Sequence, residues 1–348
     1  MVEPLLSPAA WVVLGLLALL ALVFAGLALF ARHTARKVER ALPPGGHFRE
    51  IDGHLLHYVD SADDDPAARD KPTVVLVHGL GAQMQHLTHS LMERLTDEFR
   101  VVALDRPGAG WSVRARRSSH SLFDQAAVVT NFIRSLGADA NEPRPVLVGH
   151  SLGGAVAVCA ALDHRTAYSG FVLLAPATHR GELPAIFEGV NIVSPAKRRL
   201  AAWTVATPML IRNGEAMQRE GFAPEEPPAD FATRGGGLLG LRPGAFQTTS
   251  ADLIAAGDDL PRMEARYDEL RGAPIAVVHG AEDTIVPTEA NGVRFAERVG
   301  APIELIEGAG HMIPVTQADR VAEFVARHVR EWTAPRARER GGAQAEAV

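Results

Sequence analysis

Residues 146–153 read VLVGHSLG and are followed by the small residues GAVA. The apolar run at 146–148 is typical of a buried strand, and the small residues after it indicate a helix packed close behind. Gly149 and Gly153 carry no Cβ that would collide with a sharp strand–turn–helix reversal, so the turn can hold Ser151 in a strained backbone region. Such a turn lifts the Ser151 hydroxyl above the sheet, beside the free N–H groups that begin the helix. Ser151 is therefore the candidate nucleophile.

A base and an acid for this serine follow two later strand patterns. A serine hydroxyl is a weak nucleophile until a base takes its proton, and the base needs a carboxylate to orient it. The apolar run at 274–278 leads to Asp283, and the run at 303–306 leads to a glycine-rich loop that carries His311. The glycines would let His311 reach over the sheet edge toward Ser151, with Asp283 accepting the other imidazole N–H. Glu282 is the alternative acid, in which case Asp283 would be a helix N-cap.

Backbone donors are needed for the negative charge that develops when a carbonyl is attacked. One donor would be the N–H of Leu152, directly after the nucleophile. The other would come from the loop HGLG at 78–81, which follows the strand pattern TVVLV. Gly79 and Gly81 allow this loop to bend, so that the N–H of Leu80 would enter the same pocket.

These motifs, with the loop DRPGAGWS at 105–112, resemble the α/β-hydrolase fold family over about residues 48–328. The resemblance implies an α/β fold with a mostly parallel central sheet flanked by helices. It also implies the roles of nucleophile, acid, base and oxyanion donors for Ser151, Asp283, His311, Leu80 and Leu152. Serine at the turn argues against the haloalkane and epoxide hydrolases of this family, which carry aspartate there. A small departure is Gln317, six residues after the histidine, where many relatives carry glutamate.

The N-terminal region predicts one transmembrane helix. Residues 9–31 are uncharged and almost wholly apolar, and as a helix they would extend about 34 Å, enough to cross a hydrocarbon core of about 30 Å. The stretch is too long for a secretory signal and lacks its basic start and cleavage site, which favours a membrane anchor over a cleaved signal. Basic residues follow at 32, 36, 37 and 40, so the positive-inside rule predicts residues 1–7 outside and the catalytic domain in the cytoplasm.

A long segment separates the strand patterns at 171–174 and 275–278, and in the family that this chain resembles such a segment caps the active site. Within it, LAAWTVATPMLI at 200–211 predicts a helix that faces the core and ends at Pro208. The alternative is an apolar wall for an acyl chain, or a lid surface that touches lipid. The predicted organisation is an anchor with a basic flank at 1–40, a core at 41–178 and 263–331, a helical cap at 179–262 and a disordered tail at 332–348.

Composition and charge exclude several classes of function. The formal net charge of −6 provides no electrostatic footprint for nucleic acid. His54 and His57 fall in a strand pattern and would face opposite sides, and His86 and His89 lack a third ligand at suitable spacing, so no metal and no cofactor are expected. The single cysteine, Cys159, lies among small residues and is interpreted as a packing residue.

The sequence thus predicts a membrane-anchored serine hydrolase that cleaves carboxylic esters through an acyl-enzyme at Ser151. Acylglycerols or lysophospholipids fit as substrates, because residues 9–31 would hold the enzyme beside the lipid bilayer. A C–C bond hydrolase, thioesterase or amidase with the same triad is one alternative. A non-catalytic ligand-binding receptor on a hydrolase scaffold is another. The oligomeric state is left open.

Overall fold

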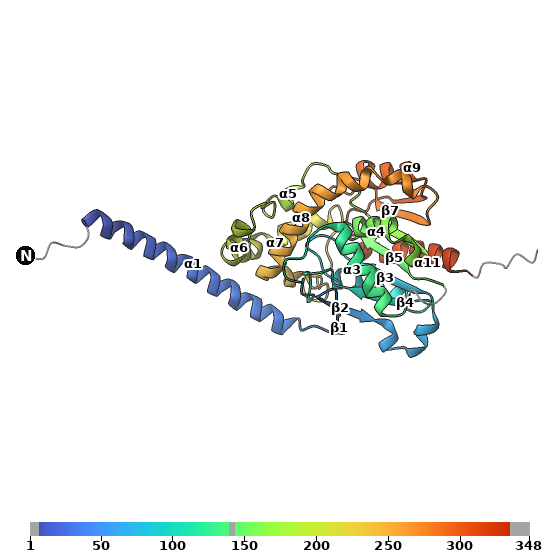
Figure 1. The fold of residues 1–348 in the computed structure, drawn as a ribbon, viewed down its shortest axis with the longest axis horizontal. Coiled ribbons are helices and arrows are strands. Elements are labelled where there is room, and N and C mark those ends of the chain that lie inside the picture. Colours follow the sequence, from blue (N-terminus) through green and yellow to red (C-terminus); the bar gives the residue numbers. More distant parts are fainter. Residues whose placement is uncertain (1–6, 139–142, 335–348) are drawn as a thin grey trace, which may run out of the picture.

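The computed structural model describes residues 7–138 and 143–334, and a β-sheet lies at its centre (Figure 1). Within these residues the strands are β1 His47–Ile51, β2 His54–Asp60, β3 Thr73–Val77, β4 Arg100–Leu104, β5 Val146–His150, β6 Gly170–Leu174, β7 Ile275–Gly280 and β8 Ile303–Ile306. They form one sheet in the order β1-β2-β4-β3-β5-β6-β7-β8. The pairs β1–β2 and β2–β4 are antiparallel, and the other neighbours are parallel. The predicted mostly parallel α/β sheet is confirmed.

Helices cover both faces of this sheet because alternate strand residues point to opposite sides. In β3, Val75 and Val77 pack into a cluster with residues of α3 and α4, whereas Val74 and Leu76 pack into a second cluster with residues of α11. The flanking helices are α2 Gln85–Thr88, α3 Leu122–Ser135, α4 Leu152–Asp163, α9 Arg294–Val299, α10 Ile313–Thr316 and α11 Ala318–Thr333. The two apolar layers hold the sheet rigid, so the loops at its edge have a fixed base.

The loops that carry the candidate site residues all follow the carboxyl ends of parallel strands. β3 leads into the loop at 78–81, β5 ends one residue before Ser151, β7 leads to Asp283 and β8 leads to His311. Because parallel strands place their carboxyl ends at one edge of a sheet, these loops share that edge.

A helical cap follows β6, made of α5 Ala185–Glu188, α6 Pro195–Trp203, α7 Ala206–Phe222, the 3₁₀ helix η5 Gly237–Leu241 and α8 Pro243–Glu264. The prediction of one helix ending at Pro208 is wrong. The helix breaks at Thr204 and Val205, and Pro208 lies in the first turn of α7, where a missing N–H costs no helical hydrogen bond. The expectation that this segment faces the core is also wrong for much of its length, because Leu200 and Met209 are exposed.

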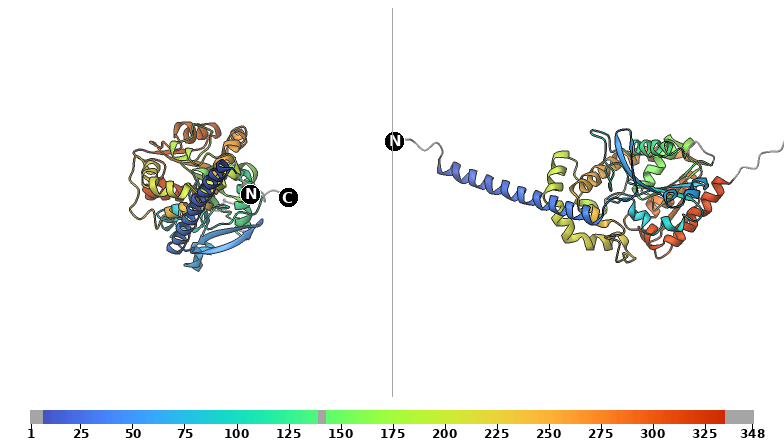
Figure 2. Two further views of the ribbon diagram at one scale, coloured as in Figure 1. Left: turned by 90° about the vertical axis from the view of Figure 1, so that its left-hand side faces the viewer. Right: turned by 90° about the horizontal axis from the view of Figure 1, so that it is seen from below.

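α1 Pro8–Ala41 is a single helix that projects from the domain beside the cap (Figures 1 and 2). Its outer part exposes its apolar side chains, whereas Ala31, Ala35 and Val38 are buried where α1 contacts η5, α6, α7 and α8. Of the helices in the described ranges it alone is long and apolar enough to cross a membrane, with a mean hydropathy of 2.9 over its most apolar window. Residues 1–6, part of the segment predicted to lie outside the cell, are not among the described residues.

The C-terminal helix α11 continues to Thr333, two residues into the segment predicted as a disordered tail. Trp332 explains the extension, because its ring packs against the start of β6: a Cβ on Gly170 would lie 2.0 Å from it. The remainder of that segment, residues 335–348, falls outside the described residues.

Candidate active site

Ser151 sits in a strained turn between β5 and α4, with φ 55° and ψ −119°. Its N–H donates to Leu174 O (2.9 Å) and its carbonyl accepts from Ala177 N (3.1 Å), so the neighbouring strand fixes the turn from both sides. A Cβ on Gly149 would lie 2.3 Å from Gly153 O. A Cβ on Gly153 would lie 2.2 Å from the carbonyl oxygen of β3's last residue. Both glycines are therefore required by close backbone contact. A backbone in this region costs about 1–3 kcal/mol, which the surrounding contacts must offset.

The loop after β3 lies directly against Ser151. A Cβ on Gly79 would be 2.9 Å from Ser151 Cβ and 3.3 Å from Ser151 Oγ, so only glycine lets the loop approach this closely. Gly81 has φ +65° and lies near Thr249 of the cap. In the described part of the chain, the N–H groups of Leu80 and Leu152, which directly follow Gly79 and Ser151, make no hydrogen bond.

His78 holds this loop as a neutral side chain. Its Nε2 accepts from Arg106 N (2.9 Å), so the proton is on Nδ1, which donates to Gly79 O (2.9 Å). Burial, together with the charge of Arg106, lowers the pKa of His78 well below its usual value. The imidazole therefore positions the loop.

Asp283 and His311 form a buried pair. His311 Nδ1 donates to Asp283 Oδ2 at 2.7 Å, while Asp283 Oδ1 accepts from the N–H groups of Ile285 (2.9 Å) and Val286 (2.8 Å). Burial alone would raise the pKa of Asp283, but the charge of His311 and the hydrogen bonds from both histidines, His311 and His279, outweigh it and lower the pKa. Asp283 is thus an ionised acceptor that fixes the His311 tautomer with its proton on Nδ1.

His279 is a contact that the sequence analysis missed. It lies near the end of β7, and its Nε2 lies 3.0 Å from both Asp283 Oδ2 and Val286 O. A Cβ on Gly292 would lie 2.3 Å from His279 Nδ1, so the ring is held tightly between β7 and the following helix. The only signal in the sequence is its position four residues before Asp283. This spacing does not show that the turn after β7 brings the two side chains into contact.

The loop that carries His311 is held from two sides. His150 Nε2 donates to His311 O at 3.0 Å, and the two rings lie 4.8 Å apart. From the cap, Glu225 accepts from Gly310 N (3.2 Å), from Thr316 Oγ1 (2.8 Å) and from Gln317 Nε2 (2.7 Å). These contacts account for Gln317: an amide donates to the Glu225 carboxylate, whereas glutamate would repel it.

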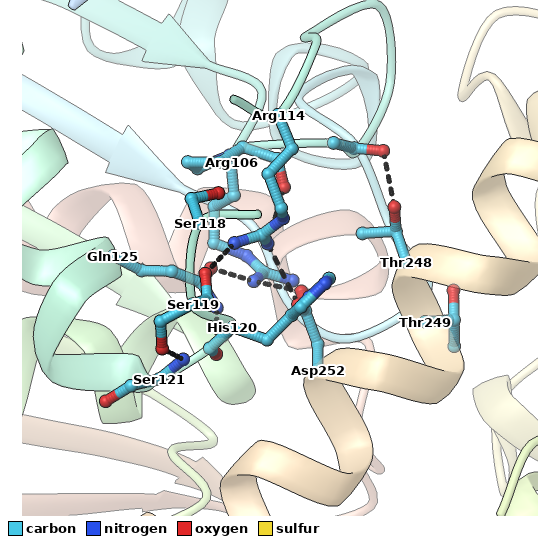
Figure 3. A network of polar contacts seen from close by, with 12 residues as sticks. Arg106, Arg114, Ser118, Ser119, His120, Ser121, Gln125, Thr248, Thr249 and Asp252 are labelled. Carbon is cyan, nitrogen blue, oxygen red and sulfur yellow. Dashed lines mark hydrogen bonds and ion pairs between the residues drawn. The ribbon is translucent and has the colours of Figure 1, made fainter. Parts of the chain in front are cut away.

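A buried polar network ties α8 of the cap to the loop after β4 (Figure 3). Asp252 on α8 accepts from Arg106 Nη1 (2.8 Å), Arg114 Nη2 (3.0 Å) and His120 Nδ1 (2.8 Å). Arg106 is almost fully buried and also donates to Gly79 O, His78 O and Gln125 Oε1. Although burial would raise the pKa of Asp252, Arg106 and its other partners lower it. The guanidinium of Arg106 therefore braces the loop beside Ser151.

The structure brings the predicted residues together in two groups. In the first group, Gly79 lies against Ser151. In the second, Asp283 is hydrogen-bonded to His311, whereas the alternative acid Glu282 is exposed. Over the described ranges no hydrogen bond joins Ser151 Oγ to His311. His150, the neighbour of Ser151, contacts the backbone oxygen of His311, and catalytic hydrogen bonds are often long before substrate binds. Among the described residues, no group of three or more His, Cys, Asp or Glu side chains is placed to hold a metal ion.

Comparisons with known proteins agree with this fold. A model of the alpha/beta hydrolase family matches residues 74–324. The magnesium-chelatase 30 kDa subunit of Rhodobacter capsulatus is 29% identical over 74% of this chain and 87% of its own. A monoacylglycerol lipase of Mycolicibacterium smegmatis is 27% identical over 67% of this chain and 76% of its own. The chain spans about a third of three other curated relatives.

Among solved structures, a bacterial membrane phospholipase A superposes with a TM-score of 0.61 at 21% identity, covering 94% of this chain and 100% of its own. A 2-hydroxy-6-oxo-6-phenylhexa-2,4-dienoate hydrolase of Rhodococcus superposes with a TM-score of 0.64 at 18% identity, covering 82% and 100%. At sequence identities this low, the structural similarity establishes the fold alone. The family model covers most of the chain, and the chain belongs to the alpha/beta hydrolase family.

Proposed function

We propose that this hydrolase cleaves carboxylic esters by way of an acyl-enzyme at Ser151. The observation that carries the proposal is the combination of Ser151 in its strained turn with an ionised Asp283 bonded to His311. This is the arrangement in which one imidazole nitrogen is held by a carboxylate and the other is free to take a proton from serine.

The chemistry follows from these positions. Ser151 Oγ attacks the ester carbonyl carbon while its proton passes to His311 Nε2. The carbonyl oxygen becomes an oxyanion, for which the free N–H groups of Leu80 and Leu152 are the donors. Collapse of the tetrahedral intermediate breaks the ester C–O bond, and His311 returns the proton to the departing alcohol. Water then attacks the acyl-enzyme with His311 again as base, which releases the carboxylic acid and restores the serine.

Lipid esters are the substrate class that the surroundings favour. Relatives described as monoacylglycerol lipases support this choice. So does α1, whose outer part presents an apolar surface suited to a bilayer. We infer that α1 anchors the enzyme, with the catalytic domain on the cytoplasmic side because the basic residues of α1 follow its apolar stretch.

The arrangement of charges near the site disfavours a substrate that carries a carboxylate, as the C–C bond alternative would require. The buried guanidinium of Arg106 is neutralised by Asp252 and bonded to Gly79 O, so it has little capacity left for a ligand. The same triad would also serve thioester or amide cleavage. A panel of esters of graded chain length, monoacylglycerols, lysophospholipids, thioesters, amides and C–C bond substrates separates these activities.

The decisive experiment is Ser151→Ala. Labelling of the full chain by a fluorophosphonate probe and turnover of short p-nitrophenyl esters should both disappear. Ser169→Ala is the matched control, because that serine lies before β6 and away from the turn, and it should retain both. Persistent labelling of Ser151→Ala would remove Ser151 from the mechanism. Wild-type protein without labelling or turnover would favour the non-catalytic receptor.

A further inference from the structure

The cap carries a concentrated apolar surface that the proposed chemistry does not use. Nine large apolar side chains outside α1 are exposed in the described residues, and six of them fall within positions 193–211. We call these six the apolar cap face: Val193, Leu200, Trp203, Val205, Met209 and Ile211, with exposed fractions between 36% and 72%. Scattered single apolar residues are normal on protein surfaces, whereas two thirds of those outside α1 fall in this one 19-residue segment, which favours an interaction site there.

The position of α1 identifies what this face meets. α1 contacts α6, α7 and η5, and it runs past the cap in Figure 1 and in the right-hand view of Figure 2. Side chains of α1 are partly buried from Phe24 and fully buried from Ala31, at the end of the apolar stretch of residues 9–31. The cap therefore lies at the level where α1 would leave a bilayer. Any bilayer that α1 spans has its surface beside α6 and the start of α7.

The chemistry of the flanking residues fits a lipid surface. Lys197 and Arg199 are exposed on α6, next to the apolar cap face, and Arg32, Arg36 and Lys37 follow the apolar stretch of α1. Basic residues beside exposed apolar side chains suit the headgroup layer, where lysine and arginine meet anionic lipid. Trp203 has the amphipathic ring that favours the membrane–water boundary.

We propose that the apolar cap face is inserted in the headgroup boundary of the leaflet on the domain side of the bilayer spanned by α1. This inference rests on the anchoring role proposed above. It makes the protein bind the membrane at two places, the spanning helix and the cap. The cap that covers the active site is then in contact with the lipid phase, and a lipid ester can enter beneath it without crossing water.

Tryptophan fluorescence tests the proposal on the full chain. The chain has four tryptophans, and Trp11 lies in the apolar stretch of α1, so the parent variant is Trp11→Phe. It is reconstituted in phosphatidylcholine vesicles with brominated acyl chains and compared with Trp11→Phe/Trp203→Phe. We expect at least a twofold larger fractional quenching in the parent. Trp111 and Trp332, which are partly buried in the domain, are the internal controls. Equal quenching in the two proteins overturns the cap contact.

A kinetic arm separates the cap contact from catalysis. Leu200→Gln/Met209→Gln/Ile211→Gln should lower kcat/KM at least fivefold for a long-chain monoacylglycerol in vesicles and leave a short water-soluble ester unchanged. Phe48→Gln/Val113→Gln, two exposed apolar positions outside the cap, is the matched control and should change neither rate. Unchanged rates for the triple variant on vesicles overturn the proposal.

The experiments distinguish a failure of the cap contact from a failure of ester cleavage or of anchoring by α1. Quenching needs no hydrolase activity, so it decides the cap contact even if ester cleavage is not found. A wild-type chain that does not float with vesicles overturns both the anchor and the cap contact. A chain that floats but gives equal quenching in the two tryptophan variants overturns the cap contact alone.

Discussion

The contact between Glu225 and Gln317 yields a quantitative prediction, because it connects the cap to the histidine loop through a single carboxylate. Glu225 Oε1 accepts from Gln317 Nε2 at 2.7 Å, and Oε2 accepts from Gly310 N and Thr316 Oγ1. Gln317→Glu would remove a charge-assisted hydrogen bond of about 1.5–3 kcal/mol. It would also bring two carboxylates within about 4 Å, a repulsion of about 1–4 kcal/mol depending on how much water enters. Because Glu225 is half-buried, we take the lower part of both ranges and expect about 3 kcal/mol of destabilisation.

The matched rescue is Glu225→Gln/Gln317→Glu, which exchanges the amide and the carboxylate between the two positions. In this double variant the amide oxygen at position 225 accepts from Gly310 and Thr316, and the amide NH₂ donates to the carboxylate at position 317. All three hydrogen bonds are therefore kept, and the pair again carries a single negative charge. We expect a coupling energy of about 2 kcal/mol from urea unfolding of the detergent-solubilised chain. The turnover of a short ester should fall about tenfold in Gln317→Glu, with KM unchanged, and recover in the double variant. A double variant as impaired as the sum of the two single ones would refute the reasoning.

Four further predictions concern the candidate site and the proposed anchor. Asp283→Asn should lower kcat about 10⁴-fold, as measured with a soluble ester, because His311 would lose the acceptor that fixes its tautomer. Since its partners lower the pKa of Asp283, the stability it contributes is present above its unfolded value of about 3.9 and is lost as pH falls through the lower folded value. Asp283→Asn should therefore flatten the acid limb of a circular-dichroism unfolding profile, and an unchanged limb would contradict this. Gly149→Ala should destabilise the fold by more than about 3 kcal/mol, whereas Gly189→Ala, which meets nothing within 4 Å, should stay within about 1 kcal/mol in the same urea titration. Finally, the full chain should stay in the membrane pellet after alkaline carbonate extraction, and release into the supernatant would count against anchoring by α1.

Local patterns in the sequence predicted the sheet well. The runs at 73–77, 171–174 and 303–306 all form strands, because each is a short apolar or β-branched segment between breakers. The turn at Ser151 followed from two glycines whose backbone contacts leave no room for a Cβ. The sequence left two neighbouring residues, Glu282 and Asp283, as candidates for the acid of the triad. The folded structure distinguishes them, because Asp283 is buried and Glu282 is exposed.

Contacts between distant segments could not be predicted in the same way. Glu225 lies 92 residues before Gln317, and no periodicity links a cap loop to the histidine loop. The break between α6 and α7 at Thr204 and Val205 was not predicted, because these two residues carry no local signal for a helix end, whereas Pro208 does. The burial of Ala31 on the cap depends on where α1 passes the domain, which a hydropathy pattern does not contain.

The Asp252 network also limits how the enzyme can admit its substrate. Swinging α8 away would strand the buried guanidinium of Arg106 without its counterion, at a cost of about 3–5 kcal/mol. That cost corresponds to an opened population below about one molecule in a hundred. An outward movement of α8 is therefore a costly way to admit substrate, whereas a movement of α6 and α7 would leave the Arg106–Asp252 ion pair intact.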